Sequence, residues 1–246
     1  MKLILLRHGE SIWNLENRFT GWANVELTDN GKSEARNAGV LISNENIDLD
    51  YVYVSLLKRA IKSSKLCLNQ LKNKKINTIR DWRLNERHYG SLQGLNKLET
   101  AKKYGSEQVK KWRRSYDIPP PALSNNDDRH PRFDNLYKNI DSNMLPKSES
   151  LKDTLERVKP LWQGEILPKL KKNKNILIVA HGNSLRAIVK ILKKISNKDI
   201  INLNIPTGAP YVFNFNSGMV ITSDKYLGNE EEIFRKIKLV ANQASK

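Results

Sequence analysis

The sequence predicts a single α/β domain, a three-layer sandwich in which a mostly parallel central sheet is flanked by helices. Short apolar runs alternate along the 246 residues with segments whose apolar residues recur at helical spacing, which is the pattern of strands joined by crossover helices. The chain has 12 Gly, 9 Pro, no internal repeat and no obvious linker. A chain of this length suits one large domain, so we expect one domain over residues 1–246.

The first half of the chain supplies three predicted strands and two predicted helices. The strands are the apolar runs at residues 2–6, 51–54 and 76–80. A polar helix opens at residues 28–31, and a second helix begins near Leu57 with apolar residues at helical spacing. Each helix therefore lies between two strands, as a parallel crossover requires.

Prolines and polar residues interrupt this pattern in the middle of the chain. Three prolines at 119–121 stop helical structure, and residues 122–146 are aperiodic and rich in Asn and Asp, which predicts a long surface excursion. A helix resumes at Ser150, with Pro160 inside it as a possible kink. The clearest buried strand is predicted at residues 176–180, and a further strand at 211–215. A terminal helix is predicted at 229–242, and a flexible tail at 241–246.

The net charge is strongly positive, with 43 Lys and Arg against 26 Asp and Glu, or +17. Such a charge can indicate a nucleic-acid partner, but it can also reflect a lysine-rich solvated surface. No zinc-finger spacing, RNP-type aromatic motif or basic heptad accompanies the charge. We therefore expect no nucleic-acid partner, and we assign part of the charge to a pocket for a small anionic substrate.

Other features of the composition exclude further classes. No run of 18 apolar residues is present, so no spanning helix and no membrane association are predicted. The single Cys67 excludes an internal disulfide. Neither a His-Glu-x-x-His motif nor a carboxylate cluster suggests a metal site, so we expect none. A cytoplasmic location is the simplest expectation.

Two histidines occupy equivalent positions after two predicted strands. His8 and Gly9 follow the first strand, and His181 and Gly182 follow the buried strand at 176–180. Ligand pockets of open parallel sheets lie at the carboxyl ends of the strands, so both histidines are expected at one edge, close together. A glycine after each histidine permits a sharp turn and a close approach to a ligand. A lone histidine would be read as structural, whereas this repeated arrangement indicates a site.

Arginines and one glutamate lie at the same predicted edge. Arg7 adjoins His8, Arg59 follows the second strand, and Glu86 follows the third. Because the guanidinium fork binds phosphate oxygens in pairs, several converging arginines suit a phosphoryl group. Glu86 is the only carboxylate within a dense motif there, so it is the candidate general acid and base.

These residues together predict phosphoryl transfer. A neutral imidazole can attack phosphorus and form a phosphohistidine, which divides one difficult transfer into two easier ones. Arg7, Arg59 and a cationic His181 could then stabilise the charge on the equatorial oxygens of the transition state.

The motifs resemble the cofactor-dependent phosphoglycerate mutases of the histidine phosphatase superfamily over nearly the whole chain, from Leu3 to about Val240. The opening block is LRHGES at 6–11, WNLENRF at 13–19 and GW at 21–22. The middle block is WRLNERHYG at 82–90 with LNK at 95–97, and the later blocks are WRRSYD at 112–117 and AHGNSLR at 180–186. A general histidine phosphatase would share only the first histidine motif, one arginine and the second histidine, so the middle block favours the mutase branch.

The resemblance implies interconversion of 2- and 3-phosphoglycerate in glycolysis and gluconeogenesis, with 2,3-bisphosphoglycerate as the cofactor that phosphorylates His8. It implies Glu86 as proton donor or acceptor and His181 as transition-state stabiliser, with catalytic contributions from Arg7 and Arg59. Family members are usually dimers or tetramers, so a homodimer or homotetramer is implied. The implied substrate-binding residues are Arg7, His8, Gly9, Glu10, Ser11, Ile12, Trp13, Asn14, Thr20, Gly21, Arg59, Glu86, Arg87, His88, Tyr89, Lys97, Arg113, Arg114, Gly182 and Asn183.

Two alternatives stay open at this point. A histidine phosphatase, acting on bisphosphoglycerate or another phosphate ester, would pass the phosphoryl group of His8 to water. The two activities differ in how completely the pocket closes, which a sequence does not reveal. A polyanion-binding protein is a more remote alternative, because Glu86 would weaken binding to a phosphate backbone.

Overall fold

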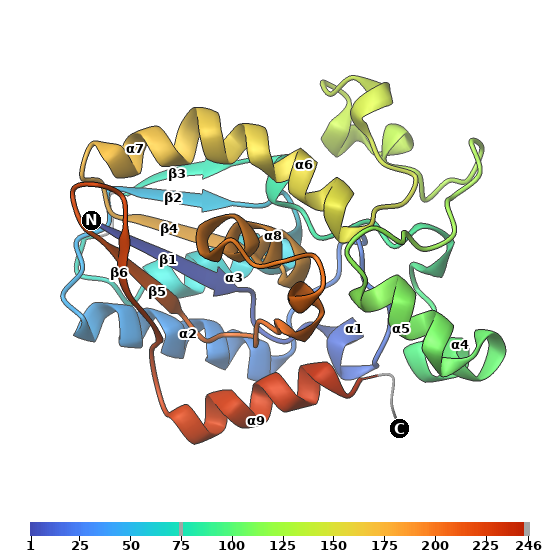
Figure 1. Ribbon diagram of the computed structural model, residues 1–246, viewed down its shortest axis with the longest axis horizontal. Helices are drawn as coiled ribbons and strands as arrows, with labels where there is room; N and C mark the ends of the chain where they lie inside the picture. The colour runs from blue at the N-terminus through green and yellow to red at the C-terminus, as the bar shows by residue number, and fades with distance from the viewer. Residues whose placement is uncertain (74–75, 244–246) are drawn as a thin grey trace.

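A six-stranded sheet forms the centre of the chain in the computed structural model, which describes residues 1–73 and 76–243 (Figure 1). The strand order is β3-β2-β4-β1-β5-β6. The first four strands run parallel, whereas β5 and β6 are antiparallel to their neighbours, so the predicted mostly parallel sheet is confirmed. The strands are β1 (Lys2–Arg7), β2 (Tyr51–Val54), β3 (Asn77–Arg80), β4 (Ile176–Ala180), β5 (Tyr211–Phe215) and β6 (Ile221–Tyr226).

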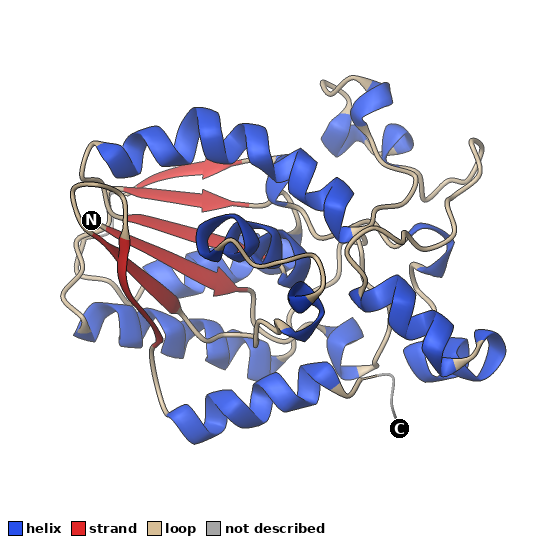
Figure 2. Cartoon of the chain, in the orientation of Figure 1, coloured by secondary structure: helices blue, strands red, loops and turns tan. Residues whose placement is uncertain are grey.

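Helices cover both faces of the sheet, which confirms the predicted three-layer sandwich (Figure 2). Successive side chains of a strand point to opposite faces, so Leu3 and Leu5 of β1 pack on one layer and Ile4 and Leu6 on the other. The helices of the two layers are α6 (Leu151–Leu161), α7 (Leu167–Lys171) and α8 (Gly182–Lys193) on the first, and α2 (Asp29–Asn44) and α3 (Lys58–Leu68) on the second.

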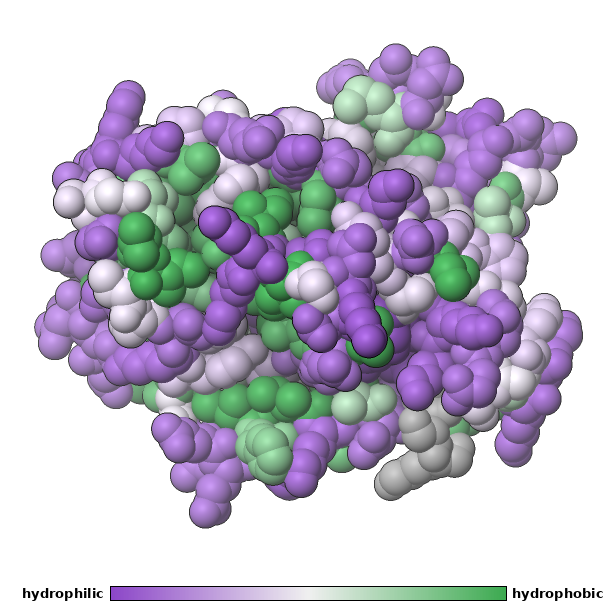
Figure 3. Space-filling model, viewed as in Figure 1, coloured by the Kyte–Doolittle hydropathy of each residue, from purple (hydrophilic) through white to green (hydrophobic). Residues whose placement is uncertain are grey.

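The remaining helices lie beyond the carboxyl ends of the parallel strands or alongside α2 (Figure 1). They are α1 (Ile12–Leu15), α4 (Lys97–Tyr104), α5 (Ser106–Arg114) and α9 (Glu230–Ala241). Short 3-10 turns join them at Trp82–Leu84, Gly90–Leu92, Pro131–Phe133, Asn135–Tyr137, Ser142–Met144 and Asp199–Asn202. Within the described ranges, no helix is long and apolar enough to cross a membrane, and hydrophilic residues cover most of the face in Figure 3.

The structure refines several predicted boundaries. The third strand begins at Asn77, one residue later than expected, and the terminal helix spans Glu230–Ala241 rather than 229–242. Pro160 lies in the last turn of α6 and is followed by a π-helical turn, Trp162–Ile166, because proline cannot donate a backbone hydrogen bond there. Residues 244–246 of the predicted tail lie outside the described residues.

The excursion at 122–146 is less superficial than its composition suggested. Leu123, His130, Tyr137 and Leu145 are buried, and the Tyr137 hydroxyl accepts a hydrogen bond from Nδ2 of Asn85 at 2.9 Å. Isolated apolar and aromatic residues among Asn and Asp therefore fasten the segment to the body of the protein. The sequence reading had no periodic signal for this, since 3-10 turns bury single residues rather than a stripe.

Candidate active site

Strand register brings the two predicted histidines together at one edge of the sheet. Arg7, the last residue of β1, pairs in register with Ala180, the last residue of β4. The backbone N–H of His8 donates to the carbonyl of Ala180 at 3.1 Å, and the rings of His8 and His181 lie 4.9 Å apart between centroids. The expected proximity of the two rings is confirmed.

His8 is held with one ring nitrogen on the backbone and the other on a guanidinium. Its Nδ1 lies 2.7 Å from the carbonyl oxygen of Gly9, and its Nε2 accepts from Nε of Arg59 at 3.2 Å. A carbonyl can only accept, so Nδ1 carries the proton and Nε2 carries the lone pair. Burial, then Arg59 and Arg7, hold the pKa of His8 well below 6.5, so the ring is neutral.

Arg59 is fixed by the backbone that follows the opening motif. Its Nη1 donates to the carbonyl of Ala23 and its Nη2 to that of Gly21, each at 2.8 Å. Burial lowers the pKa of Arg59 to about 10, which leaves it charged at neutral pH. A buried cation thus stands beside a neutral imidazole, an arrangement suited to an incoming phosphoryl group.

His181 is also neutral, which corrects the expectation of a cationic ring. It is fully buried, and this burial, followed by Arg59 and His8, holds its pKa well below 6.5. Its Nε2 lies 2.7 Å from Oγ of Ser55, the residue directly after β2. Its Nδ1 has no hydrogen-bond partner among the described residues. The ring therefore keeps one polar nitrogen available to a ligand.

The Glu86 carboxylate lies on the first turn of α8, close to both histidine motifs. Its Oε1 accepts from the backbone N–H groups of Arg87 at 2.8 Å and Asn183 at 3.0 Å. A β-carbon added to Gly182 would lie 3.7 Å from its Oε2 and 3.7 Å from Cζ of Arg7. The second carboxylate oxygen and the Arg7 guanidinium thus both lie beside Gly182, and this oxygen is not used in either backbone bond.

A cavity of about 60 Å³ opens beside these groups and is lined mainly by cations. Of its lining residues in the described part of the chain, six are Arg or Lys and only Glu86 is acidic. The residues that line it are Arg7, Asn14, Arg18, Thr20, Glu86, Tyr89, Lys97, Arg113, Arg114, Gly182, Asn183, Arg186, Asn204, Ile205, Val240 and Gln243.

Burial, and after it the crowding of like charges, lowers the pKa values of two of these cations. Burial, then Arg113 and Arg7, lower the pKa of Lys97 well below 10.5. Burial, and after it the charge of Arg113, lowers the pKa of Arg114 well below 12.5. Nε and Nη1 of Arg87 are buried without a partner among the described residues, as is Nε of Arg7. Buried N–H donors without acceptors are costly, so the cavity is built for a ligand with several anionic oxygens.

The end of α9 closes one side of this cavity. Oε1 of Gln243 accepts from Nζ of Lys97 and Nη2 of Arg113, each at 3.1 Å. The carbonyl of Val240 accepts from Nη2 of Arg114 at 2.7 Å. A polar oxygen of the protein thus lies among the cations where an anionic oxygen of a ligand would also bind.

Several predicted residues lie around the cavity rather than in its wall. His8, Arg59 and His181 are not among its lining residues. Arg87 donates Nη2 to the hydroxyl of the lining residue Tyr89 at 3.3 Å, and Gly21, which follows the lining residue Thr20, accepts from Arg59. The others are on the adjoining loop and helix or in the protein interior; they are Gly9, Glu10, Ser11, Ile12, Trp13 and His88.

Gly9 has a packing role in the fold. A β-carbon there would lie 2.0 Å from the carbonyl oxygen of Gly31, so this glycine permits close packing on α2. His88 also has a packing role, because its Nδ1 accepts from the amide of Gly90 and its ring lies 5.8 Å from that of Trp22. Burial lowers the pKa of His88 to about 3.

Six cavity residues were not predicted. Arg18 and Arg186 stood at the ends of motifs already quoted, so their charge was a usable signal. Asn204, Ile205, Val240 and Gln243 come from loops and a helix end that carry no local motif. Within residues 1–73 and 76–243, no group of three or more His, Cys, Asp or Glu side chains is placed so that it could hold a metal ion.

Comparison with known proteins gives consistent similarities. The sequence matches the histidine phosphatase superfamily (branch 1) at residues 3–144 and 124–223. It is 53% identical over 245 residues to the 2,3-bisphosphoglycerate-dependent phosphoglycerate mutase 2 of Bacteroides thetaiotaomicron, covering 100% of this chain and 99% of the relative. It is 51% identical, with the same coverage, to the 2,3-bisphosphoglycerate-dependent phosphoglycerate mutase of Elusimicrobium minutum.

Solved structures share the fold at lower identity. A mycobacterial glucosyl-3-phosphoglycerate phosphatase superposes with a TM-score of 0.67 at 20% identity, over 92% of this chain and 96% of that one. The alpha-ribazole phosphatase from Shigella flexneri gives a TM-score of 0.64 at 20% identity, over 93% and 96%.

Proposed function

The chain belongs to the histidine phosphatase superfamily, and we propose that it interconverts 2-phosphoglycerate and 3-phosphoglycerate through a phosphohistidine on His8, primed by 2,3-bisphosphoglycerate. The observation that carries the proposal is the cation-lined cavity with one carboxylate, next to a neutral histidine pair. The chain is 53% identical over its whole length to a 2,3-bisphosphoglycerate-dependent phosphoglycerate mutase, which supports phosphoglycerates as the substrates. The reaction is a step of glycolysis and gluconeogenesis.

His8 is the proposed nucleophile because its Nε2 lone pair is held toward the site by the bond from Nδ1 to Gly9. The Nε2–P bond forms as the bond between phosphorus and the donor oxygen breaks. Phospho-His8 then passes its phosphoryl group to the free hydroxyl of bound 3-phosphoglycerate, which breaks the Nε2–P bond and forms 2,3-bisphosphoglycerate. When the bisphosphoglycerate returns the phosphoryl group from its other oxygen to Nε2, 2-phosphoglycerate leaves and His8 is phosphorylated again.

Glu86 is the proposed general acid and base. Its protonated form gives a proton to the oxygen that leaves phosphorus, and its carboxylate takes the proton from the hydroxyl that attacks phospho-His8. Two backbone N–H groups fix Oε1, so Oε2 is the oxygen available for this proton.

Arg59 and His181 are the proposed stabilisers of the transferring group. Arg59 donates to Nε2 of His8 and would donate to a phosphoryl oxygen bound there instead. Oγ of Ser55 accepts from the amide of Leu57 at 3.3 Å, so its O–H can point to Nε2 of His181. The ring proton of neutral His181 then lies on Nδ1, where it can bond a phosphoryl oxygen.

The residues present fit 2,3-bisphosphoglycerate, a substrate with two phosphates and a carboxylate. One phosphate would face His8 and Arg59, and the unpartnered donors of Arg7 and Arg87 call for further anionic oxygens. Lys97, Arg113 and Arg114 would receive the remaining anionic groups in place of Gln243. All of the substrate-binding residues that the family resemblance implies, from Arg7 to Asn183, are part of this proposal. The proposal includes no metal, because arginines and lysine supply the positive charge.

One assay tests the proposal against a phosphatase. The purified protein is given 3-phosphoglycerate with and without 2,3-bisphosphoglycerate, while 2-phosphoglycerate and inorganic phosphate are followed together by phosphorus NMR. We expect 2-phosphoglycerate to form rapidly only after priming, with little phosphate released. Release of inorganic phosphate as the main product would support the phosphatase alternative. The homodimer or homotetramer stays a prediction, which light scattering of the purified protein would test. The cytoplasmic location also stays a prediction.

A further inference from the structure

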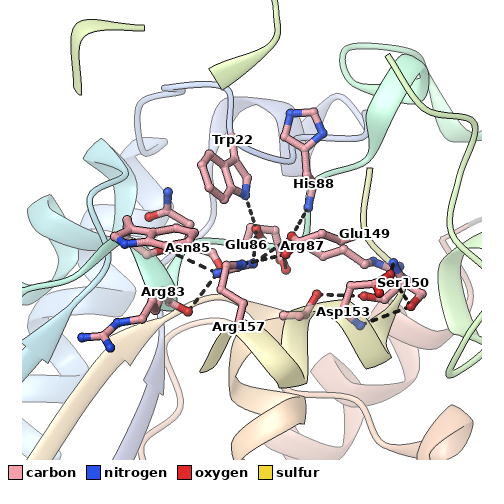
Figure 4. Close-up of polar contacts among 12 residues, drawn as sticks. Trp22, Arg83, Asn85, Glu86, Arg87, His88, Glu149, Ser150, Asp153 and Arg157 are labelled. Carbon is pink, nitrogen blue, oxygen red and sulfur yellow. Dashed lines mark hydrogen bonds and ion pairs between the residues drawn. The ribbon is translucent and has the colours of Figure 1, made fainter. Parts of the chain in front are cut away.

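A buried ion pair stands behind Glu86, outside the cavity lining. Nε of Arg157 lies 2.6 Å from Oε1 of Glu149, and the two side chains are only 5% and 3% exposed. Arg157 is on α6, and Glu149 lies two residues before that helix begins. Neither residue belongs to the motifs that predicted the site, and Figure 4 shows Arg157 below Glu86 and Glu149 to one side of it.

The guanidinium of Arg157 binds the carbonyls on the N-terminal side of the Glu86 side chain. Nη1 donates to the carbonyls of Trp82, Arg83 and Asn85 at 3.3, 2.8 and 3.2 Å. Nη2 donates to the carbonyl of Glu86 itself at 3.2 Å (Figure 4). One side chain therefore binds four carbonyls in and directly after the 3-10 turn Trp82–Leu84.

Glu149 holds the other side of the same segment. Its Oε2 accepts from the backbone N–H of His88 at 2.8 Å and from Nη2 of Arg157 at 2.8 Å. The carbonyl of Glu86 also accepts from Nε1 of Trp22 at 2.5 Å, and Arg157 lies over the Trp22 ring at 5.4 Å. The backbone before and after Glu86 is thus bound to one ion pair.

This arrangement matters because residues 85–89 belong to neither a helix nor a strand. Their backbone groups have no regular ladder to fix them, so side chains must supply the bonds. A buried ion pair seldom adds net stability compared with well-packed apolar residues. Its value here lies in holding several carbonyls and an N–H in one geometry, which the planar, five-donor fork of arginine suits and the single ammonium of lysine does not.

We propose that Arg157 and Glu149 are positioning residues for the reaction, which act by fixing the Glu86 carboxylate against the substrate oxygen. The proposal rests on the proposed role of Glu86. Because a reacting group displaced by about 1 Å can lose about 10²-fold in rate, loosening this pair should lower kcat through Glu86 while the binding residues remain in place.

The test is a double-mutant cycle with Glu86. Arg157→Lys and Glu149→Gln are each made in the wild-type chain and in a Glu86→Gln chain, and kcat and KM for the mutase reaction are measured. In the wild-type chain we expect kcat to fall about 30- to 100-fold with KM changed by less than about three-fold. In the Glu86→Gln chain the same substitutions should cost almost nothing further, because the group that they position is already gone.

A second readout needs no activity. Hydrogen exchange of the backbone amides at 85–90 should become faster in both variants, while the exchange of β1 and β4 amides stays unchanged. The matched controls are Lys159→Gln and Glu156→Gln, which remove an exposed pair on the same helix and should alter neither readout. If Arg157→Lys does not fold, Glu149→Gln carries the test alone.

Three results would overturn the positioning role, and a fourth would separate it from the proposed function. Losses that multiply in the Glu86→Gln chain would mean that the pair supports the fold generally, as would faster exchange throughout the sheet. An unchanged kcat with unchanged exchange at 85–90 would mean that the segment does not depend on the pair. A wild-type chain without mutase activity that still shows local loosening in the variants would remove the proposed function but leave the structural link intact.

Discussion

Nε of Arg59 donates a hydrogen bond to Nε2 of His8 over 3.2 Å, so the lone pair of the proposed nucleophile faces a guanidinium. The other two nitrogens of Arg59 are bound to the carbonyls of Gly21 and Ala23, which keeps the cation in this place. A phosphoryl group that arrives at His8 therefore meets a donor that is already oriented, with no reorganisation of the protein during the reaction.

Replacing Arg59 should damage phosphoryl transfer far more than removing surface charge. Arg59→Ala removes the oriented donor, and loss of a donor that strengthens in the transition state costs about 2–4 kcal/mol, or about 10²–10³ in kcat. Lys171 and Lys172 are exposed before β4, so the double change to Gln should alter kcat little and affect encounter rates only in a salt-dependent way. Steady-state kinetics at two ionic strengths make the comparison. Equal losses in both variants would contradict the assignment of the site.

The buried neutral histidines should make stability depend on pH. Burial holds the pKa values of His8 and His181 well below 6.5 and lowers that of His88 to about 3. Below the unfolded value of about 6.5, the unfolded chain binds protons that the folded chain does not, so stability falls as the pH drops from about 6.5 toward 3. Each histidine contributes up to about 1.4 kcal/mol per pH unit.

Urea unfolding at pH 7.5, 6.5 and 5.5 measures this dependence. The free energy of unfolding should fall slightly between pH 7.5 and 6.5 and more steeply between pH 6.5 and 5.5. His88→Asn, which keeps an acceptor near the amide of Gly90, should reduce the slope by about one third. A stability that rises between pH 6.5 and 5.5 would show that these rings are charged in the folded protein.

The contact of Gln243 with Lys97 and Arg113 should influence where the phosphoryl group goes. Gln243→Ala opens the cavity on that side, and a more open site lets water compete with phosphoglycerate for phospho-His8. We expect the ratio of inorganic phosphate release to mutase turnover to rise about three-fold or more. Asn242→Ala is the control, because that side chain is exposed. The same ratio in both variants would argue against closure by Gln243.

The glycine after His8 should be intolerant of a side chain for reasons of packing. A β-carbon at Gly9 would lie 2.0 Å from the carbonyl oxygen of Gly31, so Gly9→Ala should destabilise the protein by about 3 kcal/mol. A β-carbon at Gly164 would have no atom within 4 Å, so Gly164→Ala should leave stability unchanged or raise it by up to about 1 kcal/mol. Thermal unfolding separates the two. A tolerated alanine at Gly9 would show that β1 and α2 are not locked together there.

Local patterns predicted the parts of the molecule that local patterns determine. The buried strand at 176–180 and the position of two histidines at strand ends follow from hydrophobicity and from the rule for parallel sheets. Strand β6 was missed because it is a polar, half-exposed edge strand with little apolar alternation. The helices α4 and α5 were likewise not predicted, because they are short and bury few apolar residues.

The residues that hold the site in place or close its cavity were harder to predict than the residues proposed to react. Arg157 and Gln243 lie 71 and 157 residues beyond Glu86 in the chain, and only folding brings them to it or to its cavity. The charge state of His181 was predicted wrongly for a related reason, because burial and the neighbouring Arg59 are tertiary properties.

Trapping the phosphorylated protein tests the central claim most directly. Incubation with 2,3-bisphosphoglycerate labelled in its phosphates should transfer one phosphoryl group per chain to His8, found as an acid-labile, base-stable adduct by mass spectrometry. His8→Ala should carry no label, while His130→Asn, which changes a histidine outside the proposed binding set, should label like the wild type. Label that persists in the His8→Ala protein, or that is absent from the wild type, would contradict a phosphohistidine mechanism at this site.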